Sequence, residues 1–441
     1  MLNFAAQLWT DVLIGYRNLV QHSKRTLFLG GAIAAVTALL VLLTGLSTGI
    51  RETMLKSATT LMSGHVNVGG FYKVTAGQSA PVVTDYARVV DVVKKAGGSD
   101  IDYVTARGRG WAKVVSDTGS MQAGIGGIDI DNEPNFKQVV RLTSGKLEDL
   151  RQPRTMLVFE NQAKKLDVKV GDTVTLSAQT TRGTNMTVDV RIVAVAKDIG
   201  LFSSFNTYVP AVTLRELYQL NAASTGAIYV YLKDMRRIPV ALASIRAGLE
   251  GAGYRLMDPD PKAFWMKFDV VNREDWTGQK LDLTTWEDEI SFVTWVLSAL
   301  GWLTGLLIGI LLVIVVIGIM NTMWIAIRER TREIGTLRAI GMQRGRVMWM
   351  FLAEALMLGV AGTGTGAVAG ALLAVLVNAA HLHVPLAAQL FLMSDTVRLA
   401  TRWGDVAGGI AKIVIFTGLA ALWPALRAAR LKPVTAMTHF G

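Results

Sequence analysis

The chemistry that this sequence offers is concentrated in one arginine-rich segment. Six arginines lie within residues 328–346, in the run RERTREIGTLRAIGMQRGR. If this run is helical, Ile334, Leu337 and Gly341 share one side of the helix and Arg332 lies on the other. A small apolar face with charges around it is typical of a helix that docks into a groove on a partner. The rival interpretation is a passive membrane anchor, which needs arginines but no particular order.

We predict that this docking helix receives force from a soluble partner in the cytoplasm. Short arginine-rich connections between membrane spans stay on the cytoplasmic side, because moving arginines across the hydrocarbon core is costly. The residues expected to contact the partner are the charged and apolar side chains of one stretch: Arg328, Glu329, Arg330, Thr331, Arg332, Glu333, Ile334, Leu337, Arg338, Ile340 and Gly341.

Catalytic and metal-binding patterns are missing from the sequence. It contains neither H-E-x-x-H nor the phosphate-binding pattern G-x-x-x-x-G-K-[ST]. It also contains no cysteine, which excludes disulfides, thiolate metal sites and a cysteine nucleophile. We therefore expect no enzyme activity from this chain alone, and no metal or other cofactor bound to it.

Composition points to a membrane protein with one large water-facing domain. Of the 441 residues, 51% are hydrophobic and 18% are charged, and the mean hydropathy is +0.37. Such a chain is too apolar for an ordinary soluble protein and too charged for a purely intramembrane one. The net charge of +11 could suggest nucleic acid. Many arginines lie beside apolar segments, however, so contact with the lipid bilayer explains the charge better and no nucleic-acid partner is expected.

Four segments are long and apolar enough to cross a bilayer. They are expected within residues 27–48, 285–327, 347–379 and 406–426. The first could instead be a signal peptide, although its apolar run is longer than usual for one and no small-x-small cleavage site clearly follows.

The segments between these spans complete the expected organisation. Residues 1–26 have a helical apolar stripe and should form an amphipathic helix in the membrane interface, or one that packs against a neighbouring span. With the 328–346 link inside, both termini are cytoplasmic, and so is the tail 427–441. Residues 49–284 then form a large extracytoplasmic domain, and 380–405 a short loop on the same side.

The second span should extend out of the membrane as a stalk. Residues 285–327 contain no proline, and Thr284 and Glu287 have the spacing of a capping box. Apolar residues then follow in steps of four and three, which predicts a coiled-coil-like seam: Trp286, Ile290, Val293, Leu297 and Leu300. A core-facing helix of the outer domain is the rival interpretation.

Glycines in the third span predict close helix packing. Gly362, Gly366 and Gly370 are four residues apart, the small-xxx-small spacing of membrane helices whose backbones approach each other.

The outer domain has a mixed α/β pattern. Strands are predicted from Val, Ile, Thr and Tyr content with partial alternation, over residues 155–159, 173–177, 186–196 and 227–232. Helices are predicted over residues 81–95, 160–166, 213–220 and 237–250. The fold class is therefore an integral membrane α-helical protein with four transmembrane helices and a large mixed α/β domain inserted between the first and second.

The chain resembles the FtsX-like, or MacB-type, permeases of ABC transporters. The resemblance is most specific in NTM at 321–323, ERTREIG at 329–335 and LRAIG at 337–341. Glu354-Ala355 and the run from Pro424 to Val434 fit the family as well. The order of elements is most similar to the lipoprotein-releasing branch. In contrast to that branch's carrier-binding subunit, however, residues 177–188 are short and lack proline.

This resemblance implies a subunit of an ATP-driven complex in the bacterial inner membrane. Two copies of a separate cytoplasmic ABC ATPase would bind ATP and Mg²⁺, and a second permease subunit would complete a homodimer or heterodimer. The arginine-rich link would contact the ATPase, and the stalk-like first and second helices would carry motion to the outer domain.

Three functions are compatible with the resemblance. The leading hypothesis is extraction or export of a lipoprotein or other hydrophobic substrate. Its cavity would form between the first and second helices of two permease copies, with walls that include Leu39, Leu43, Leu312 and Val316. Ordinary packing between spans explains these four residues equally well. One alternative is a macrolide or peptide efflux permease that works with a periplasmic adaptor. The other is a mechanotransducing permease that activates an envelope enzyme.

Overall fold

The computed structural model describes residues 17, 20–21, 23–75, 78–180, 183–385, 388–389, 393 and 396–431. Most of the interfacial helix expected over residues 1–26 and most of the tail expected over 427–441 lie outside them. The chain divides into two compact units. The helical unit comprises Met1–Arg51, Ser298–His383 and Thr396–Gly441, and the sheet unit comprises Glu52–Leu297 with Val384–Asp395.

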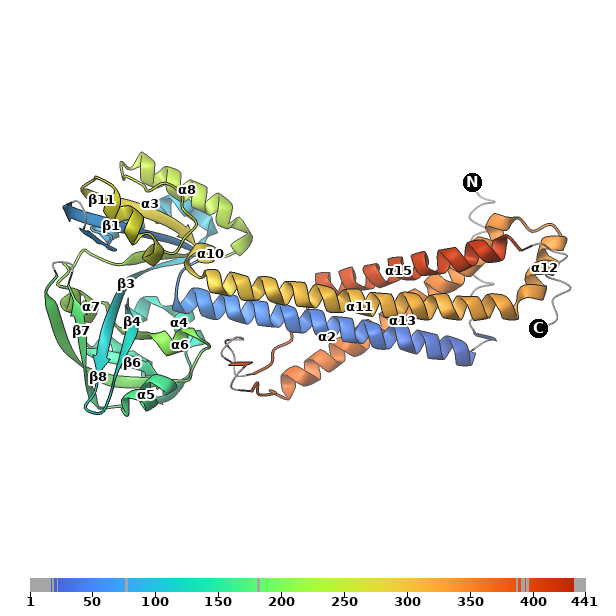
Figure 1. Ribbon diagram of the computed structural model, residues 1–441, viewed down its shortest axis with the longest axis horizontal. Coiled ribbons are helices and arrows are strands. Elements are labelled where there is room, and N and C mark those ends of the chain that lie inside the picture. The colour runs from blue at the N-terminus through green and yellow to red at the C-terminus, as the bar shows by residue number, and fades with distance from the viewer. Residues whose placement is uncertain are drawn as a thin grey trace. The chain divides into compact units, whose positions relative to one another are not determined.

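The helical unit is built from long apolar helices that pack side by side (Figure 1). They are α2 (Ser23–Leu61), α11 (Ser291–Glu329), α13 (Arg344–Ala379) and α15 (Trp403–Ala429), with the short α12 (Thr331–Ala339) between α11 and α13. Within the described residues, the four long helices are each long and apolar enough to cross a membrane. Their shared core contains Ile33 of α2, Ile319 of α11, Phe351 of α13 and Ile413 of α15.

The sheet unit contains the strands of the structure and most of its short helices. The strands are β1 (Val66–Thr75), β2 (Gln78–Ala80), β3 (Ile101–Val115), β4 (Ser120–Ile128), β5 (Leu142–Gly145), β6 (Thr155–Phe159), β7 (Thr173–Gln179), β8 (Asn185–Ala196), β9 (Asn206–Pro210), β10 (Ala227–Leu232) and β11 (Gly278–Thr285). The helices are α3 (Tyr86–Gly97), α4 (Pro134–Val139), α5 (Glu160–Leu166), α6 (Phe202–Phe205), α7 (Ala211–Tyr218), α8 (Ile238–Gly251), α9 (Phe268–Arg273) and α10 (Trp286–Glu289). Single 3-10 turns are η1 (Gly98–Asp100), η2 (Ile130–Asn132), η3 (Leu147–Arg151), η4 (Met235–Arg237) and η5 (Phe264–Met266).

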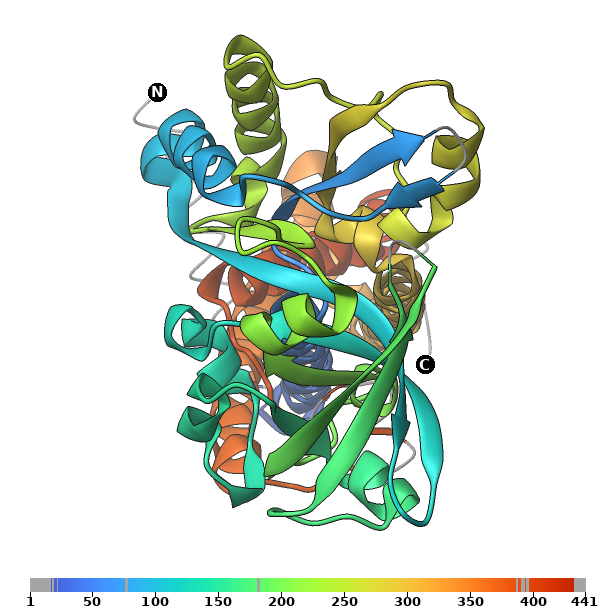
Figure 2. The same ribbon diagram turned by 90° about the vertical axis from the view of Figure 1, so that its left-hand side faces the viewer.

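Strand β3 joins two halves of this unit, each with its own core (Figure 2). Its first part pairs with β10 in the order β11-β1-β10-β3, and helices α3 and α8 pack on this half through Val89, Val93 and Ile245. Its second part pairs with both β4 and β7. The pairings β4–β9, β9–β6, β6–β8 and β8–β7 then close a ring. Parallel and antiparallel pairs both occur, so the sheet is mixed.

The strands and helices expected from sequence agree with the structure in most positions. The four predicted strands are β6, β7, β8 and β10, and the four predicted helices correspond to α3, α5, α7 and α8. Nothing in the sequence pattern predicted the long β3–β4 pair.

The expected single stalk helix over 285–327 is wrong at its beginning. Residue Thr285 still belongs to β11, α10 spans only Trp286–Glu289, and the helix breaks at Ile290 before α11 starts at Ser291. The capping box is Thr285 with Asp288, one residue later than predicted: the Thr285 N–H donates to the Asp288 carboxylate at 2.7 Å. Because β11 leads directly into α10, the long helix begins later than the apolar spacing predicted, and any stalk is shorter.

The predicted seam is accordingly divided between two helices. Trp286 lies in α10, Ile290 at the break, and Val293 in the first turn of α11, and all three are buried. Leu297 and Leu300 are half-buried on α11. The burial of the first three favours the rival interpretation, in which this stretch faces a protein core.

Candidate functional site: the coupling segment and the socket of helix α2

The coupling segment, residues 328–341, is a short helix held between two long ones. Helix α11 ends at Glu329, α12 begins at Thr331, and α13 begins at Arg344. Gly341 lies in the turn with φ of 103°, a left-handed conformation that glycine adopts without strain. The turn reverses the chain, so both ends of α12 are fixed by long helices.

The predicted docking face of α12 is partly buried in the structure. Ile334, expected to contact a partner, is only 1% exposed and lies in the core of the helical unit. Leu337 is half-buried, whereas Ile340 is 80% exposed. Half of the solvent-facing residues of the segment are charged: Arg328, Glu329, Arg332 and Glu333, beside Thr336, Ala339, Ile340 and Gly341. Thr331 and Arg338 are half-buried. The apolar spacing in α12 is therefore explained by its packing against the other helices of the helical unit.

A buried ion pair fixes the start of α12 to α13. Arg330 Nη1 donates to Glu354 Oε2 at 3.0 Å, and the two side chains are 6% and 5% exposed. Arg330 was expected to face a partner, and it faces the bundle instead. Charges in such surroundings are tolerated only when they are paired.

Aromatic residues and an arginine gather on α11 and α15. The guanidinium carbon of Arg427 lies 5.2 Å from the ring centre of Trp324 and 5.3 Å from that of Trp423. Arg427 is in the last turn of α15, where a cation complements the helix dipole. Trp and Arg at helix ends are typical of the membrane–water interface.

The glycines singled out in α13 face α2. A Cβ atom at Gly362 would lie 3.0 Å from the Gly30 carbonyl oxygen, and one at Gly370 would lie 2.9 Å from Val41 Cβ. At Gly366 it would overlap the carbonyl oxygen of Ala34. Only residues without a side chain allow the two backbones to approach this closely.

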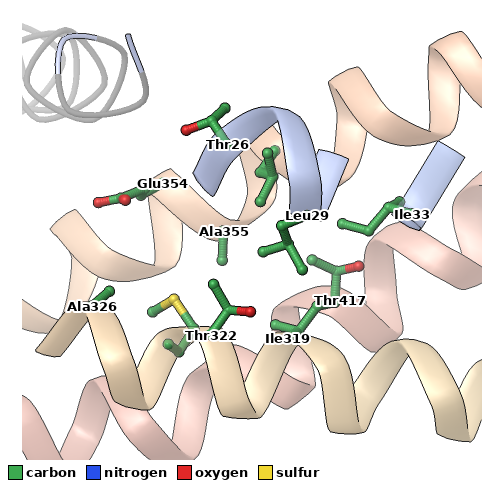
Figure 3. A pocket seen from close by; sticks show the side chains of 11 residues that line it. Thr26, Leu29, Ile33, Ile319, Thr322, Ala326, Glu354, Ala355 and Thr417 are labelled. Atoms are coloured by element: carbon green, nitrogen blue, oxygen red, sulfur yellow. The ribbon is translucent and has the colours of Figure 1, made fainter. Parts of the chain in front are cut away.

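The four residues suggested as walls of a cavity between two copies differ in burial within one copy. Leu312 is buried in the core of the helical unit, Val316 packs against that core, Leu39 is exposed and Leu43 is half-buried. A small cavity of about 20 Å³ does lie among α2, α11, α13 and α15, lined by other residues (Figure 3). Leu29, Ile319 and Ala355 contribute to its wall. This volume holds at most one water molecule and no cargo.

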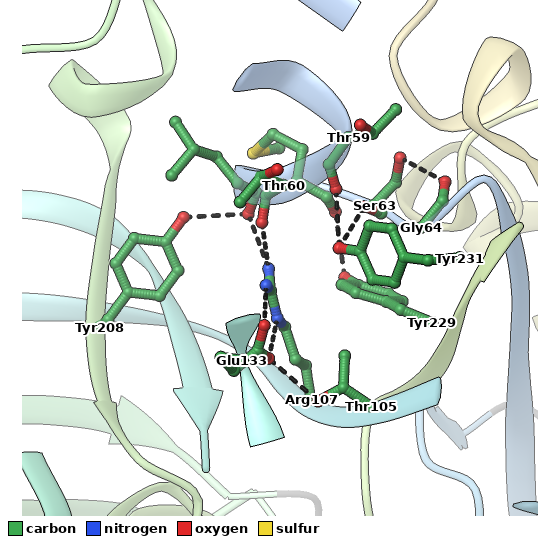
Figure 4. Close-up of polar contacts among 12 residues, drawn as sticks. Thr59, Thr60, Ser63, Gly64, Thr105, Arg107, Glu133, Tyr208, Tyr229 and Tyr231 are labelled. Atoms are coloured by element: carbon green, nitrogen blue, oxygen red, sulfur yellow. Dashed lines mark hydrogen bonds and ion pairs between the residues drawn. The ribbon is translucent and has the colours of Figure 1, made fainter. Parts of the chain in front are cut away.

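A second polar site, which sequence reasoning missed, encloses the C-terminal end of α2 (Figure 4). The last carbonyl groups of a helix have no partner within the helix. Here Arg107 donates to the Thr60 oxygen at 2.7 Å, and the Tyr208 hydroxyl donates to the Leu61 oxygen at 2.9 Å. The Tyr231 hydroxyl lies 3.0 Å from the Thr59 oxygen. We call this arrangement the α2 socket: Arg107, Glu133, Tyr208, Tyr229 and Tyr231 around residues 59–63.

Charge compensation makes the socket stable. Arg107 binds Glu133 through two nitrogens, each at 2.6 Å, and the side chains are 2% and 0% exposed. Burial alone would lower the pKa of Arg107, but the Glu133 carboxylate raises it well above the usual value. The arginine therefore stays charged and complements the negative end of the α2 dipole.

The socket and the coupling segment offer no metal site. Among the described residues, no three His, Asp or Glu side chains are grouped so that they could bind an ion. Each of the two sites can hold a helix end: the socket holds the end of α2, and the Arg330–Glu354 pair holds the start of α12.

Two family models match the chain. The MacB-like periplasmic core domain matches residues 27–247, about half of the chain, and the FtsX-like permease C-terminal model matches residues 292–433. The chain is an FtsX-like, MacB-type ABC transporter permease. The resemblance found in the NTM and ERTREIG runs is thereby confirmed. Its four apolar helices and periplasmic core domain make this permease an inner-membrane protein with a periplasmic domain.

Parts of this permease are similar to curated exporters. The pyoverdine export ATP-binding/permease protein PvdT of Pseudomonas syringae pv. tomato is 35% identical over 141 residues, covering 32% of this chain and 19% of that protein. The macrolide export ATP-binding/permease protein MacB of Sodalis glossinidius is 36% identical over 122 residues, covering 28% and 17%. The uncharacterized ABC transporter permease YknZ of Bacillus subtilis is 29% identical over 174 residues, covering 38% and 39%. The matched stretch thus spans less than a fifth of each exporter and less than half of YknZ.

Proposed function

We propose that this permease couples ATP hydrolysis on a separate ABC ATPase to extraction or export of a lipoprotein or other hydrophobic substrate. Motion of α2 and α11 would carry the work from the cytoplasmic face to the periplasmic domain. The coupling segment carries this proposal: α12 exposes charged residues, and its start is fixed to α13 by the buried pair Arg330–Glu354. A force applied to α12 therefore acts on the bundle without first bending the segment.

The partners follow from this division of work. Two ATPase copies would bind ATP and Mg²⁺ and contact the exposed face of α12 in the cytoplasm, where both termini of the permease would lie. A second permease subunit, identical or related, would complete the complex. A periplasmic carrier or adaptor would receive the substrate.

Efflux with a periplasmic adaptor is the second candidate. It is favoured by the names of the relatives, which are exporters of pyoverdine and of macrolides. The segment around the β7–β8 connection also favours it, because β7 and β8 pair as far as Gln179 and Asn185 and residues 177–188 contain no proline. A reconstituted complex separates the two: release of a labelled lipoprotein supports the first function, and ATP-dependent transport of a macrolide supports efflux.

The coupling role is tested by copurification with the ATPase. The double variant Glu333→Arg with Ile340→Asp changes the exposed face of α12 and leaves the buried Ile334 intact. We expect the ATPase to be lost and ATP turnover by the purified complex to fall. Glu148→Arg with Val240→Asp makes matched changes at exposed positions of the sheet unit and should retain the ATPase. An unchanged complex and unchanged turnover in the α12 variant would refute the proposal.

A further inference from the structure

Within the sheet unit, the end of α2 and the beginning of α10 lie close together. After α2 ends at Leu61, the chain enters β1, and β11 leads into α10 and α11. Strands β1 and β11 are antiparallel partners, with Val66 opposite Thr285. The Trp286 N–H also donates to the His65 oxygen at 3.2 Å. The end of α2 and the beginning of α10 are therefore parts of one local structure.

Two arginines of strand β3 each contact one of these helix ends. Arg107 and Arg109 are two residues apart, so their side chains lie on the same face of β3. Arg107 donates to the carbonyl of Thr60 in α2. Arg109 Nη1 lies 3.6 Å from the carboxylate of Glu289 in α10, and both side chains are buried. The same carboxylate accepts from Thr284 at 2.8 Å.

Tyr229 of β10 connects the two contacts. Its hydroxyl accepts from Arg109 Nε at 3.1 Å and donates to the Met62 oxygen at 3.0 Å. The guanidinium carbons of Arg107 and Arg109 each lie 5.2 Å from the centre of its ring. One hydroxyl therefore joins the end of α2 to the arginine that binds α10.

We propose that Tyr229 is a positioning residue that couples the two helix ends, so that a shift of α2 relative to α11 changes the angle between the two halves of the sheet unit. This inference rests on the proposed function. Strand β3 provides the route, because residues 101–107 pair in the half that contains α3 and α8, and residues 108–115 pair in the ring. A displacement of Arg107 and Arg109 reaches both cores through one strand.

The alternative is that Tyr229 only stabilises the fold. The two are distinguished by Tyr229→Phe, which retains the ring and both cation–π contacts and removes only the bridging hydroxyl. Tyr103→Phe is the matched control on the neighbouring strand β3, because among the described residues the Tyr103 hydroxyl has no hydrogen-bond partner. Arg109→Lys is a second test variant, since it retains the charge but cannot reach Tyr229 and Glu289 with the same geometry.

The experiment uses the full permease with its ATPase in nanodiscs. The chain contains no cysteine, so spin labels can be attached at Glu148→Cys in η3 and Glu250→Cys in α8, one in each half of the sheet unit. We expect ATP with Mg²⁺ and vanadate to shift the distance between the labels in the wild type and in Tyr103→Phe. Tyr229→Phe and Arg109→Lys should lose this shift while they retain the ATPase and its turnover.

The outcomes separate the inference from the proposed function. A shift of wild-type size in Tyr229→Phe and in Arg109→Lys overturns the inference and leaves the proposed function intact. Loss of turnover in parallel with the shift also overturns it, because a purely structural role would reduce both. No nucleotide-dependent shift in the wild type would refute the proposed transmission itself, and the inference with it.

Discussion

Arg330 and Glu354, 24 residues apart in the chain, form an ion pair of 3.0 Å inside the helical unit. The arginine precedes α12 and the glutamate lies in α13, so the pair closes the turn between them. Because the pair is buried, water does not compete for its hydrogen bond, and the pair constrains the position of α12 relative to α13.

Removing one charge of this pair should destabilise the permease. Glu354→Gln leaves the Arg330 charge without its carboxylate, and a broken buried pair costs about 3–5 kcal/mol. Arg330→Met combined with Glu354→Leu should recover much of this loss. Thermal unfolding in detergent of Arg330→Met, Glu354→Leu and the double variant, evaluated as a double-mutant cycle, measures the coupling. Strictly additive single variants would show that the two residues are not energetically coupled.

Close packing between α13 and α2 predicts different effects for neighbouring glycines. Gly366→Ala introduces a methyl group that overlaps the Ala34 carbonyl, which should cost about 1–3 kcal/mol through backbone displacement. A Cβ atom at Gly364 meets nothing within 4 Å, so Gly364→Ala is the control and should leave the melting temperature unchanged. Equal effects of both substitutions would contradict this packing.

The α2 socket should depend on Glu133. Glu133→Gln removes the carboxylate that neutralises Arg107, and we expect a loss of about 3–5 kcal/mol in unfolding free energy. Asp131→Asn is the control, since the Asp131–Arg151 pair is exposed and should contribute nothing measurable. If Glu133→Gln melts like the wild type, the socket does not hold the end of α2.

Protonation of His65 should weaken the fold in mild acid. Its Nδ1 accepts the Leu232 N–H at 2.9 Å, and burial lowers the pKa of His65 from 6.5 to about 4. Above pH 6.5 the residue is neutral in both states and its contribution is fully present. As the pH falls from there to about 4, the unfolded chain binds the proton first, so stability decreases.

The shift of the His65 pKa sets the expected size of this pH effect. Roughly 3 kcal/mol is expected across the window, since one pKa unit corresponds to about 1.4 kcal/mol. Thermal melting between pH 4 and 7 measures the slope, and His65→Gln should flatten it. A slope identical in the variant and the wild type would assign the acid sensitivity to other groups.

Local patterns predicted the local structure well. The strand pattern of residues 155–159 and 227–232 depends on β-branched and aromatic residues that are buried on both faces, and these segments are β6 and β10. The sequence pattern did not predict the β3–β4 pair, because glycines interrupt the alternation of apolar and polar residues in these strands. At Gly110 and Gly126 the space of a side chain is occupied by the rings of Tyr218 and Tyr208, so the reason for these glycines lies in distant residues.

The polar sites depend on pairs that are far apart in the sequence. Ile334 and Leu337 have the spacing of a docking face, yet a bundle-facing helix has the same periodicity, and only tertiary packing decides between them. Arg107 and Tyr231 were equally undetectable as partners of α2. The sequence did contain one indication of this site. Arg107 and Arg109 on one strand, and Tyr229 and Tyr231 on another, are two residues apart and therefore place polar groups on one face of each strand.

The register of β1 with β11 has an evolutionary and practical consequence. Because Val66 and Thr285 are directly opposite each other, the segment between them begins and ends at adjacent positions of one sheet. Segments with neighbouring ends can be replaced without rearranging what they are attached to. Residues 66–285 thus form a unit that a relative of this chain could exchange while it retains the same long helices.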